Sequence, residues 1–269
     1  MVDYRQNKLN KKWIIVSPKR AKRPGENKKE AKPVCPFCYG HESMTPPEVY
    51  RIGDGNPGES GWKVRVVPNK YKITDIHEVI IHHPNHDFDF EDLPEEHANL
   101  VFGVYKNRFN FHKDEGQVVI FNNCGKEAAE SLEHNHTQLA VVPANIQLDT
   151  PVIGEINLAY EDDQLLISCP RDSEWPYEVW FIPKRRDLCF GDINSDEIMS
   201  FSRNLKKVIN IIKKEVGKFS YNFYIYPSQD WYLRLIPRIT NRAGFELSTG
   251  IMVNTKDSQE VVNLLKQNL

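Results

Sequence analysis

Short apolar runs predict β-strands in both halves of the chain. They are rich in β-branched and aromatic residues and are bounded by residues that form turns, which is typical of half-buried and buried strands. In the first half these runs lie at residues 4–16, where they form a pair of strands, and at 63–67, 78–81, 118–121 and 139–142. In the second half they lie at 178–181, 221–226 and 232–236.

Two longer segments carry apolar residues at helical spacing. In the first, Asp92 can cap a helix that runs to about Phe111. In the second, Ser195 can cap a helix that ends at Gly217, because glycine favours the conformation that follows a helix. Its apolar stripe consists of Ile198, Phe201, Leu205, Ile209, Ile212 and Val216. Residues 53–61 are rich in Gly, Pro, Asn and Ser and predict a mobile loop.

The two halves resemble each other residue by residue. Residues 77–81 align without a gap on residues 177–181, and the same register places Asp87, Phe90 and Asp92 on Asp187, Phe190 and Asp192. Any two strand-loop-helix units look partly alike, but several identities in one register favour an internal duplication. We therefore predict an α+β fold of two similar units, residues 1–150 and 151–269, each an antiparallel sheet with a helix packed across it. In the second unit Asp230 and Tyr232 replace the histidines of the first.

Composition excludes several classes of protein. The chain of 269 residues has a formal net charge of -2, which gives no general attraction to nucleic acid, although residues 8–32 are strongly basic. No segment has the roughly 20 apolar residues that cross a bilayer, and the first residues lack the apolar stretch of a secretory signal. The five cysteines are an odd count that argues against a disulfide scaffold. We expect a cytoplasmic protein with no membrane or nucleic-acid partner.

A cluster of polar residues precedes the expected strand at 139–142. His134, His136 and Gln138 alternate along the chain, so on an extended backbone they point to the same side. Three polar side chains on one strand face are costly unless they have partners, and a purely structural cluster is one explanation. The nearby Gly125 and Ser131 favour another, because a loop with such residues can donate hydrogen bonds to an anion.

A second motif is Cys35-Pro36-Phe37-Cys38. Two cysteines at this spacing form half of a tetrahedral zinc site. A redox pair is the alternative, but no strand leading into a helix surrounds it as in thioredoxin-like proteins. The spacing leaves the other two ligands open, and the candidates are His41, His77, His82, His83, His86 and His134.

Together these motifs resemble the galactose-1-phosphate uridylyltransferase family of the histidine-triad (HIT-like) superfamily. The resemblance extends from Trp13 to beyond Glu246, and its motifs occur in the same order and at similar spacing. They are the Ser-Pro-x-Arg-Ala-Lys-Arg-Pro run at 17–24, the cysteine pair, Asn-Lys-Tyr at 69–71, Pro-Asn-His at 84–86, Phe-x-Asn-x-Gly at 121–125, Ser131, His-x-His-x-Gln at 134–138 and Gly-Phe-Glu at 244–246.

The resemblance assigns a role to each matching residue. It implies that one structural zinc ion per chain is bound by Cys35, Cys38, His86 and His134. It implies that His136 is the nucleophile and that Gln138 binds phosphate. The residues that it places against the nucleotide, its phosphates or the sugar are Arg20, Arg23, Asn69, Tyr71, Asn123, Ser131 and Glu246.

The activity that these roles imply is transfer of a nucleoside monophosphate from a nucleotide sugar to a sugar 1-phosphate or phosphate, through a nucleotidyl-His136 intermediate. A neutral imidazole can attack an anionic phosphoryl group and later leave from it. Four protein ligands leave no open position on the zinc ion, so its role would be structural. The resemblance also implies a possible homodimer.

Departures from the family pattern keep other activities open. The usual proline between the two histidines is Asn135, a common aspartate is Lys70, and the glutamine expected soon after Glu246 is missing. A second metal site of some members is not matched in the second half. The alternatives are a phosphorylase or hydrolase of nucleotide sugars or dinucleoside polyphosphates, and a zinc-stabilised nucleotide-binding protein without turnover.

Overall fold

One long antiparallel sheet organises the structure. The computed structural model describes residues 2–18, 20 and 34–269. Among these residues ten strands form the sheet, in the spatial order β3 (Tyr50–Gly53), β4 (Trp62–Pro68), β5 (His77–Ile81), β7 (His136–Val142), β6 (Gln117–Cys124), β11 (Tyr221–Ile225), β12 (Leu233–Pro237), β10 (Val179–Pro183), β9 (Leu165–Ser168) and β8 (Leu158–Glu161). The mixture of helices and antiparallel strands confirms the predicted α+β class.

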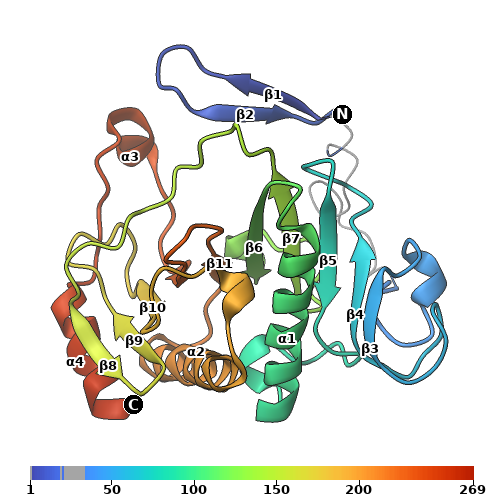
Figure 1. The fold of residues 1–269 in the computed structure, drawn as a ribbon. Helices are drawn as coiled ribbons and strands as arrows, with labels where there is room; N and C mark the ends of the chain where they lie inside the picture. The colour runs from blue at the N-terminus through green and yellow to red at the C-terminus, as the bar shows by residue number, and fades with distance from the viewer. Residues whose placement is uncertain (1, 19, 21–33) are drawn as a thin grey trace.

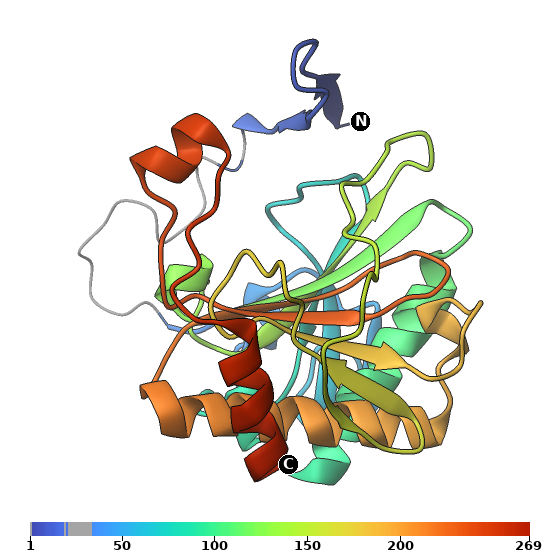
Figure 2. The same ribbon diagram turned by 90° about the vertical axis from the view of Figure 1, so that its left-hand side faces the viewer.

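Helices cover one face of this sheet. The helices α1 (Glu95–His112), α2 (Ser195–Val216) and α4 (Ser258–Asn268) enclose a large apolar core against it. The hairpin of β1 (Asp3–Gln6) and β2 (Trp13–Val16) and the short helix α3 (Gly244–Thr249) lie beyond the opposite face (Figures 1 and 2). No helix in the described part of the chain is long and apolar enough to span a bilayer.

The strand order has an internal symmetry. The first five strands run β3-β4-β5-β7-β6, and the next five, β11-β12-β10-β9-β8, repeat that order in reverse. In each half a 3-10 turn and a long helix follow the third strand: η3 (Phe90–Asp92) precedes α1, and η5 (Phe190–Asp192) precedes α2. The halves join where β6 pairs with β11, and they share one core. This arrangement is what a duplication would produce, and the division at residue 150 stays a prediction.

The ungapped alignment of β5 with β10, the third strand of each half, is wrong by one residue. Val79 packs with Ile81 on the face away from the helices, whereas Val179 packs in the core beneath the helices. Trp180 is the residue of β10 on the outer face. Because successive strand residues point to opposite faces, a shift of one residue exchanges inside and outside. Val79 therefore corresponds to Trp180.

Both predicted helices exist, but other residues cap them. Asp92 ends the turn η3, and the N-cap of α1 is Pro94. The N-cap of α2 is Asn194, whose side chain accepts a hydrogen bond from the backbone of Glu197 at 2.9 Å. The cap belongs to the residue that still has an extended backbone, and Asn194 is that residue. Gly217 ends α2 as predicted.

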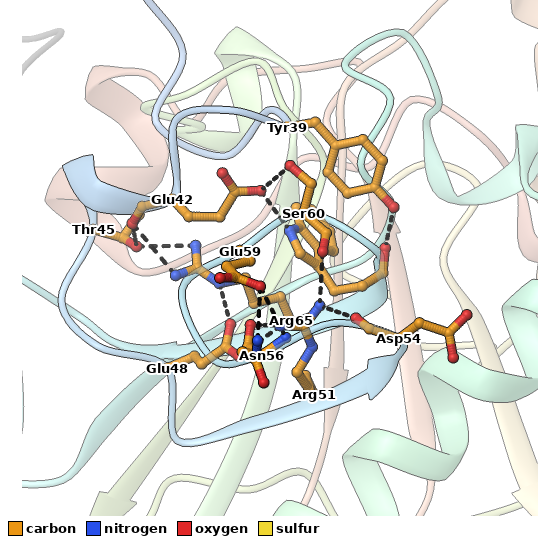
Figure 3. Close-up of polar contacts among 11 residues, drawn as sticks. Tyr39, Glu42, Thr45, Glu48, Arg51, Asp54, Asn56, Glu59, Ser60 and Arg65 are labelled. Carbon is orange, nitrogen blue, oxygen red and sulfur yellow. Dashed lines mark hydrogen bonds and ion pairs between the residues drawn. The ribbon is translucent and has the colours of Figure 1, made fainter.

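The loop at residues 53–61 is held by a polar network (Figure 3). Arg51 donates to the backbone carbonyls of Asp54 and Asn56, at 2.5 Å each. Nearby, Glu42 accepts from the indole of Trp62 at 3.0 Å, and the buried Arg65 donates to Glu48 at 2.5 Å. These contacts restrain the loop that we expected to be mobile. They also attach the segment after the cysteine pair to β3 and β4.

Candidate active site and metal centre

Four side chains predicted as metal ligands meet at one point. The ligand atoms of Cys35, Cys38, His86 and His134 all lie within 4.8 Å of one another. The Nδ1 atom of His134 is 3.5 Å from each cysteine sulfur, and that of His86 is 3.6 Å from the sulfur of Cys38. Zinc bonds of about 2.3 Å to sulfur and about 2.0 Å to nitrogen, at a tetrahedral angle, place such ligands about 3.6 Å apart. The cluster therefore fits a tetrahedral metal ion.

The surroundings of His134 favour the same role. Its Nε2 atom donates to the carbonyl of His83 at 2.6 Å, which leaves the Nδ1 lone pair facing the cysteines. Burial lowers the pKa of His134 to about 4, so at neutral pH no proton competes for that lone pair. The other histidine candidates lie elsewhere; His41, for example, contacts the carbonyl of Cys35 at 2.8 Å.

His136 begins β7, two residues after the metal cluster. Only 4% of its surface is exposed, but it lines a cavity of about 280 Å³. Its Nδ1 atom donates to the carbonyl of His134 at 2.8 Å, and the ring of Phe37 lies edge-on at 5.3 Å. With Nδ1 as the donor of this hydrogen bond, Nε2 is the ring nitrogen that would supply the lone pair of a nucleophile. One strand thus aligns a metal ligand and a candidate nucleophile.

Gln138 lines the same cavity, and buried neighbours fix its side-chain amide. The backbone N–H of Ile73 donates to Nδ1 of His77 at 3.1 Å, so the imidazole proton lies on Nε2. That proton is donated to Oε1 of Gln138 at 3.0 Å, and Asn69 donates to the same oxygen at 3.4 Å. With its oxygen held in this way, Gln138 presents its NH2 group as a donor. The position of His77 beside Gln138 could not be predicted from the sequence, because the contact joins β5 to β7.

A second polar network lies under β7, on the side of the helices. Thr137 is fully buried, and its hydroxyl contacts His82 at 2.8 Å and Tyr105 at 2.6 Å. Asn122, on β6, donates to the backbone carbonyl of His136 at 2.9 Å. These contacts fix the backbone between the two cavity residues from behind. The signal for them was the polar Thr137 at a position that faces the core.

The remaining predicted residues are only partly brought together. Asn69, Tyr71 and Ser131 line the cavity with His136. Arg20 lies beside them, because its guanidinium donates to the carbonyl of Tyr71 at 2.7 Å. Arg23 lies outside the described residues.

Two predicted residues lie away from this cavity. Asn123 accepts from Asn222 of β11 at 2.8 Å. Glu246 lies on α3, where it accepts from the backbone of Ala243 at 3.0 Å. Neither residue lines the cavity around His136.

The loop at Gly125 is arranged differently from what we expected. Its N–H donates to the carboxylate of Glu130 at 2.8 Å and is therefore already engaged. Burial raises the pKa of Glu130 to about 7. The N–H that we expected to bind an anion thus has an internal carboxyl group as its acceptor in this structure, and its binding of an anion stays a prediction.

Comparisons with known proteins agree with the motifs. No protein-family profile matches the chain. The chain is 26% identical to the ADP-glucose phosphorylase of Arabidopsis thaliana, over 98% of its own length and 92% of that protein. It is 25% identical to a galactose-1-phosphate uridylyltransferase of Thermotoga maritima, over 77% of its own length and 74% of that protein.

A solved structure shows the same fold. The structure of ADP-glucose phosphorylase from Arabidopsis thaliana with bound ADP-glucose has a TM-score of 0.76 and 23% identity, and the match covers 99% of both chains. The resemblance inferred from the motifs is therefore confirmed: the chain is a relative of the galactose-1-phosphate uridylyltransferases and of ADP-glucose phosphorylase, and it has their fold.

Proposed function

We propose that this protein is a nucleotidyltransferase that forms a covalent nucleotidyl-His136 intermediate. One observation carries the proposal: the imidazole of His136 lines a cavity while its Nδ1 proton is donated to the carbonyl of His134 at 2.8 Å. The ring is thus oriented through Nδ1 beside a space of about 280 Å³. Relatives named as uridylyltransferase and phosphorylase support the same class of enzyme.

The transfer takes two displacements at phosphorus. In the first, Nε2 of His136 forms a bond to the phosphorus of the nucleoside monophosphate, and the bond to the bridging oxygen breaks to release a sugar 1-phosphate. In the second, an acceptor oxygen attacks the same phosphorus, and the nitrogen–phosphorus bond breaks to return a neutral imidazole. Gln138 and Ser131 line the cavity and would donate to the non-bridging oxygens as their charge increases.

A zinc ion at the four-residue cluster would support this geometry without taking part in it. Cys35, Cys38, His86 and His134 would fill its coordination sphere, and a filled sphere gives a structural role. Since His134 is two residues before His136, the metal would fix the start of β7 and therefore the direction of the nucleophile.

The donor that we propose is a nucleotide sugar. The relative that matches nearly the whole chain is named ADP-glucose phosphorylase, so ADP-glucose is the first donor to test and inorganic phosphate the first acceptor. A sugar 1-phosphate, the acceptor in uridylyl transfer, is the second. We also propose that the enzyme acts in the cytoplasm and binds neither nucleic acid nor membranes.

The test is a search for the covalent intermediate. ADP-glucose and UDP-glucose are each mixed with the protein, and intact mass is measured after acid-free quenching. We expect one nucleoside monophosphate per chain, and none on His136→Asn. An unmodified protein that turns over either donor, or an equal adduct on His136→Asn, would refute the mechanism. Turnover with and without phosphate then separates a phosphorylase from a hydrolase.

Glu246 leads to a proposal about assembly. It lies on α3, beyond the outer face of the sheet (Figure 2), and the exposed Phe245, Leu247 and Ile251 lie on or just after the same helix. We propose that a homodimer covers these side chains and brings Glu246 to the sugar in the partner. Mixing inactive His136→Asn with inactive Glu246→Ala should then restore about a quarter of the activity per chain through mixed dimers. A monomer in solution, or no recovery from exchanged subunits, would exclude this arrangement.

A further inference from the structure

A second cavity lies in the half that has no catalytic histidines. It has a volume of about 400 Å³, and its lining includes Ser168, Trp180 and Arg234. These residues face one another across three neighbouring strands, because Trp180 pairs with Ser168 of β9 and with Arg234 of β12. In the first half Val79 pairs in the same way with Val67 and Gln138, and all three line the cavity of His136. The two cavities therefore occupy equivalent positions on the sheet.

The polar pair behind each cavity is also equivalent. His77 lies two residues before Val79 and contacts Gln138, and Glu178 lies two residues before Trp180 and contacts Arg234. Glu178 accepts from Nε of Arg234 at 2.7 Å and from the indole of Trp180 at 2.6 Å, both on Oε1. Its other oxygen, Oε2, has no hydrogen-bond partner among the described residues, and Glu178 is only 2% exposed.

An unpartnered carboxylate oxygen at such a site indicates a missing donor. Leaving a buried charged acceptor without its hydrogen bond is costlier than leaving a neutral one so. Glu178 lines the cavity, so a ligand hydroxyl bound there would supply that hydrogen bond once the carboxylate turns Oε2 toward it. Water could do the same, but the cavity is large enough for a small organic molecule.

The charges of the lining disfavour an anionic ligand. Each arginine that lines the cavity already faces a carboxylate: Arg234 faces Glu178 at 2.7 Å, and Arg171 faces Glu155 at 3.6 Å. Asp172 adds a further negative charge to the lining. No uncompensated cation in the described lining would attract a phosphate, so this cavity differs in chemistry from a phosphate site.

The neighbouring donor and acceptor suit a pair of hydroxyls. Arg234 has several N–H groups and Glu178 has an acceptor oxygen, side by side, and each hydroxyl of a vicinal pair can donate and accept. Trp180 and Ile182 add apolar surface that could pack against the C–H face of a ring. We propose that the cavity around Glu178 and Arg234 is a second ligand site, which binds an uncharged, hydroxyl-rich ligand of the sugar class. This site does not depend on chemistry at His136.

A cavity-filling variant offers a clean test. Gly154 lines the cavity, and a Cβ atom added there would meet nothing within 4 Å, so Gly154→Phe should fold and place an aromatic ring at the wall of the site, where it would compete with the ligand. Binding of D-glucose, D-galactose and maltose to the full chain is followed by saturation-transfer NMR. We expect binding to the wild type and to His136→Asn, and its loss in Gly154→Phe. Formation of the nucleotidyl adduct by Gly154→Phe should be unchanged.

Glu178→Gln tests the polar contact. It should weaken sugar binding about tenfold or more, which corresponds to the loss of one charge-assisted hydrogen bond. If Glu178→Gln does not fold, sugar binding by Gly154→Phe still tests the proposal. No sugar signal with the wild type, an equal signal in Gly154→Phe, or binding of inorganic phosphate in place of the sugars would each overturn the proposal.

Discussion

The contact between His77 and Gln138 gives a prediction that separates orientation from chemistry. His77 does not line the cavity, but it donates to Oε1 of Gln138 at 3.0 Å and so turns the NH2 group of that residue toward the substrate space. Replacing Gln138 by Met removes the donor at nearly constant volume. Replacing His77 by Leu leaves the donor but removes the contact that orients it.

The expected magnitudes follow from what each change removes. A preorganised donor to a developing oxyanion contributes about 2.7–4 kcal/mol, so Gln138→Met should slow adduct formation about 100- to 1,000-fold. In His77→Leu, Asn69 still contacts the same oxygen at 3.4 Å, and only one neutral hydrogen bond of about 1 kcal/mol is lost. That loss corresponds to a rate about five- to tenfold lower. Because His77 acts through Gln138, the double variant should be no slower than Gln138→Met.

The assay is a single-turnover measurement of nucleotidyl-His136 formation by rapid quench, at saturating nucleotide sugar. His77→Gln keeps an N–H donor and should lose less rate than His77→Leu. Thermal unfolding of every variant reports damage to the fold, which would lower the rate with every substrate alike. Independent, multiplicative effects of the two substitutions would refute the reasoning, as would a wild-type rate in His77→Leu.

Three further predictions concern stability and metal binding. Burial raises the pKa of Glu130, so the folded state keeps it neutral up to about pH 7, whereas in the unfolded chain it ionises above about pH 4.5. The wild type should therefore lose stability relative to Glu130→Gln as pH rises between these values. Urea unfolding at several pH values measures this, and an equal pH dependence of the unfolding free energy in both proteins would contradict it. Arg65→Met leaves the buried Glu48 without its closest partner and should cost about 3 kcal/mol of unfolding free energy, whereas loss of the exposed Arg5–Asp3 pair should cost almost nothing in the same assay. Metal analysis should find one zinc ion per chain in the wild type and none in Cys38→Ser, and the thermal unfolding midpoint of that variant should be lower by about 5 °C or more. A wild type that holds no metal and unfolds at the same temperature as Cys38→Ser would exclude the structural role.

The sequence located most of the elements because their patterns are local. The long helices and most strands follow from apolar spacing and turn residues, which act over a few positions. Three strands at the two ends of the sheet, the edge strands β3 and β8 and the neighbouring β9, were not predicted, since two of them have only weak alternation and their stability comes from neighbouring strands. The joining of both halves into one sheet could not be predicted either, because the pairing of β6 with β11 connects residues about 100 positions apart.

The candidate site shows the same division between local and distant information. Residues in compact motifs, such as Cys35, Cys38, His134 and His136, were identified with their expected neighbours. His77 was considered only as a metal candidate, because its contact with Gln138 depends on the pairing of two strands 61 residues apart. The engagement of Gly125 by Glu130 was missed for a different reason: the motif predicts a donor, but only the folded loop shows that a carboxylate occupies it.

The equivalence of the two cavities explains why the covalent intermediate that we propose would form in only one of them. Continuing the register of β10 with β12 by one residue places Tyr232 opposite Ile182, as His136 lies opposite Ile81. The hydroxyl of Tyr232 donates to the carbonyl of Pro151 at 2.5 Å, and its ring stacks on Trp180 at 4.7 Å. Burial raises the pKa of Tyr232 far above neutrality, so its oxygen stays protonated and is a poor nucleophile. Two residues further along the same strand face, Arg234 takes the place that Gln138 has in the first half, and Glu178 neutralises its charge. The same sheet geometry therefore fits the nucleotidyl transfer that we propose in one half and, at most, binding in the other, and the difference lies in side chains on one face of two strands.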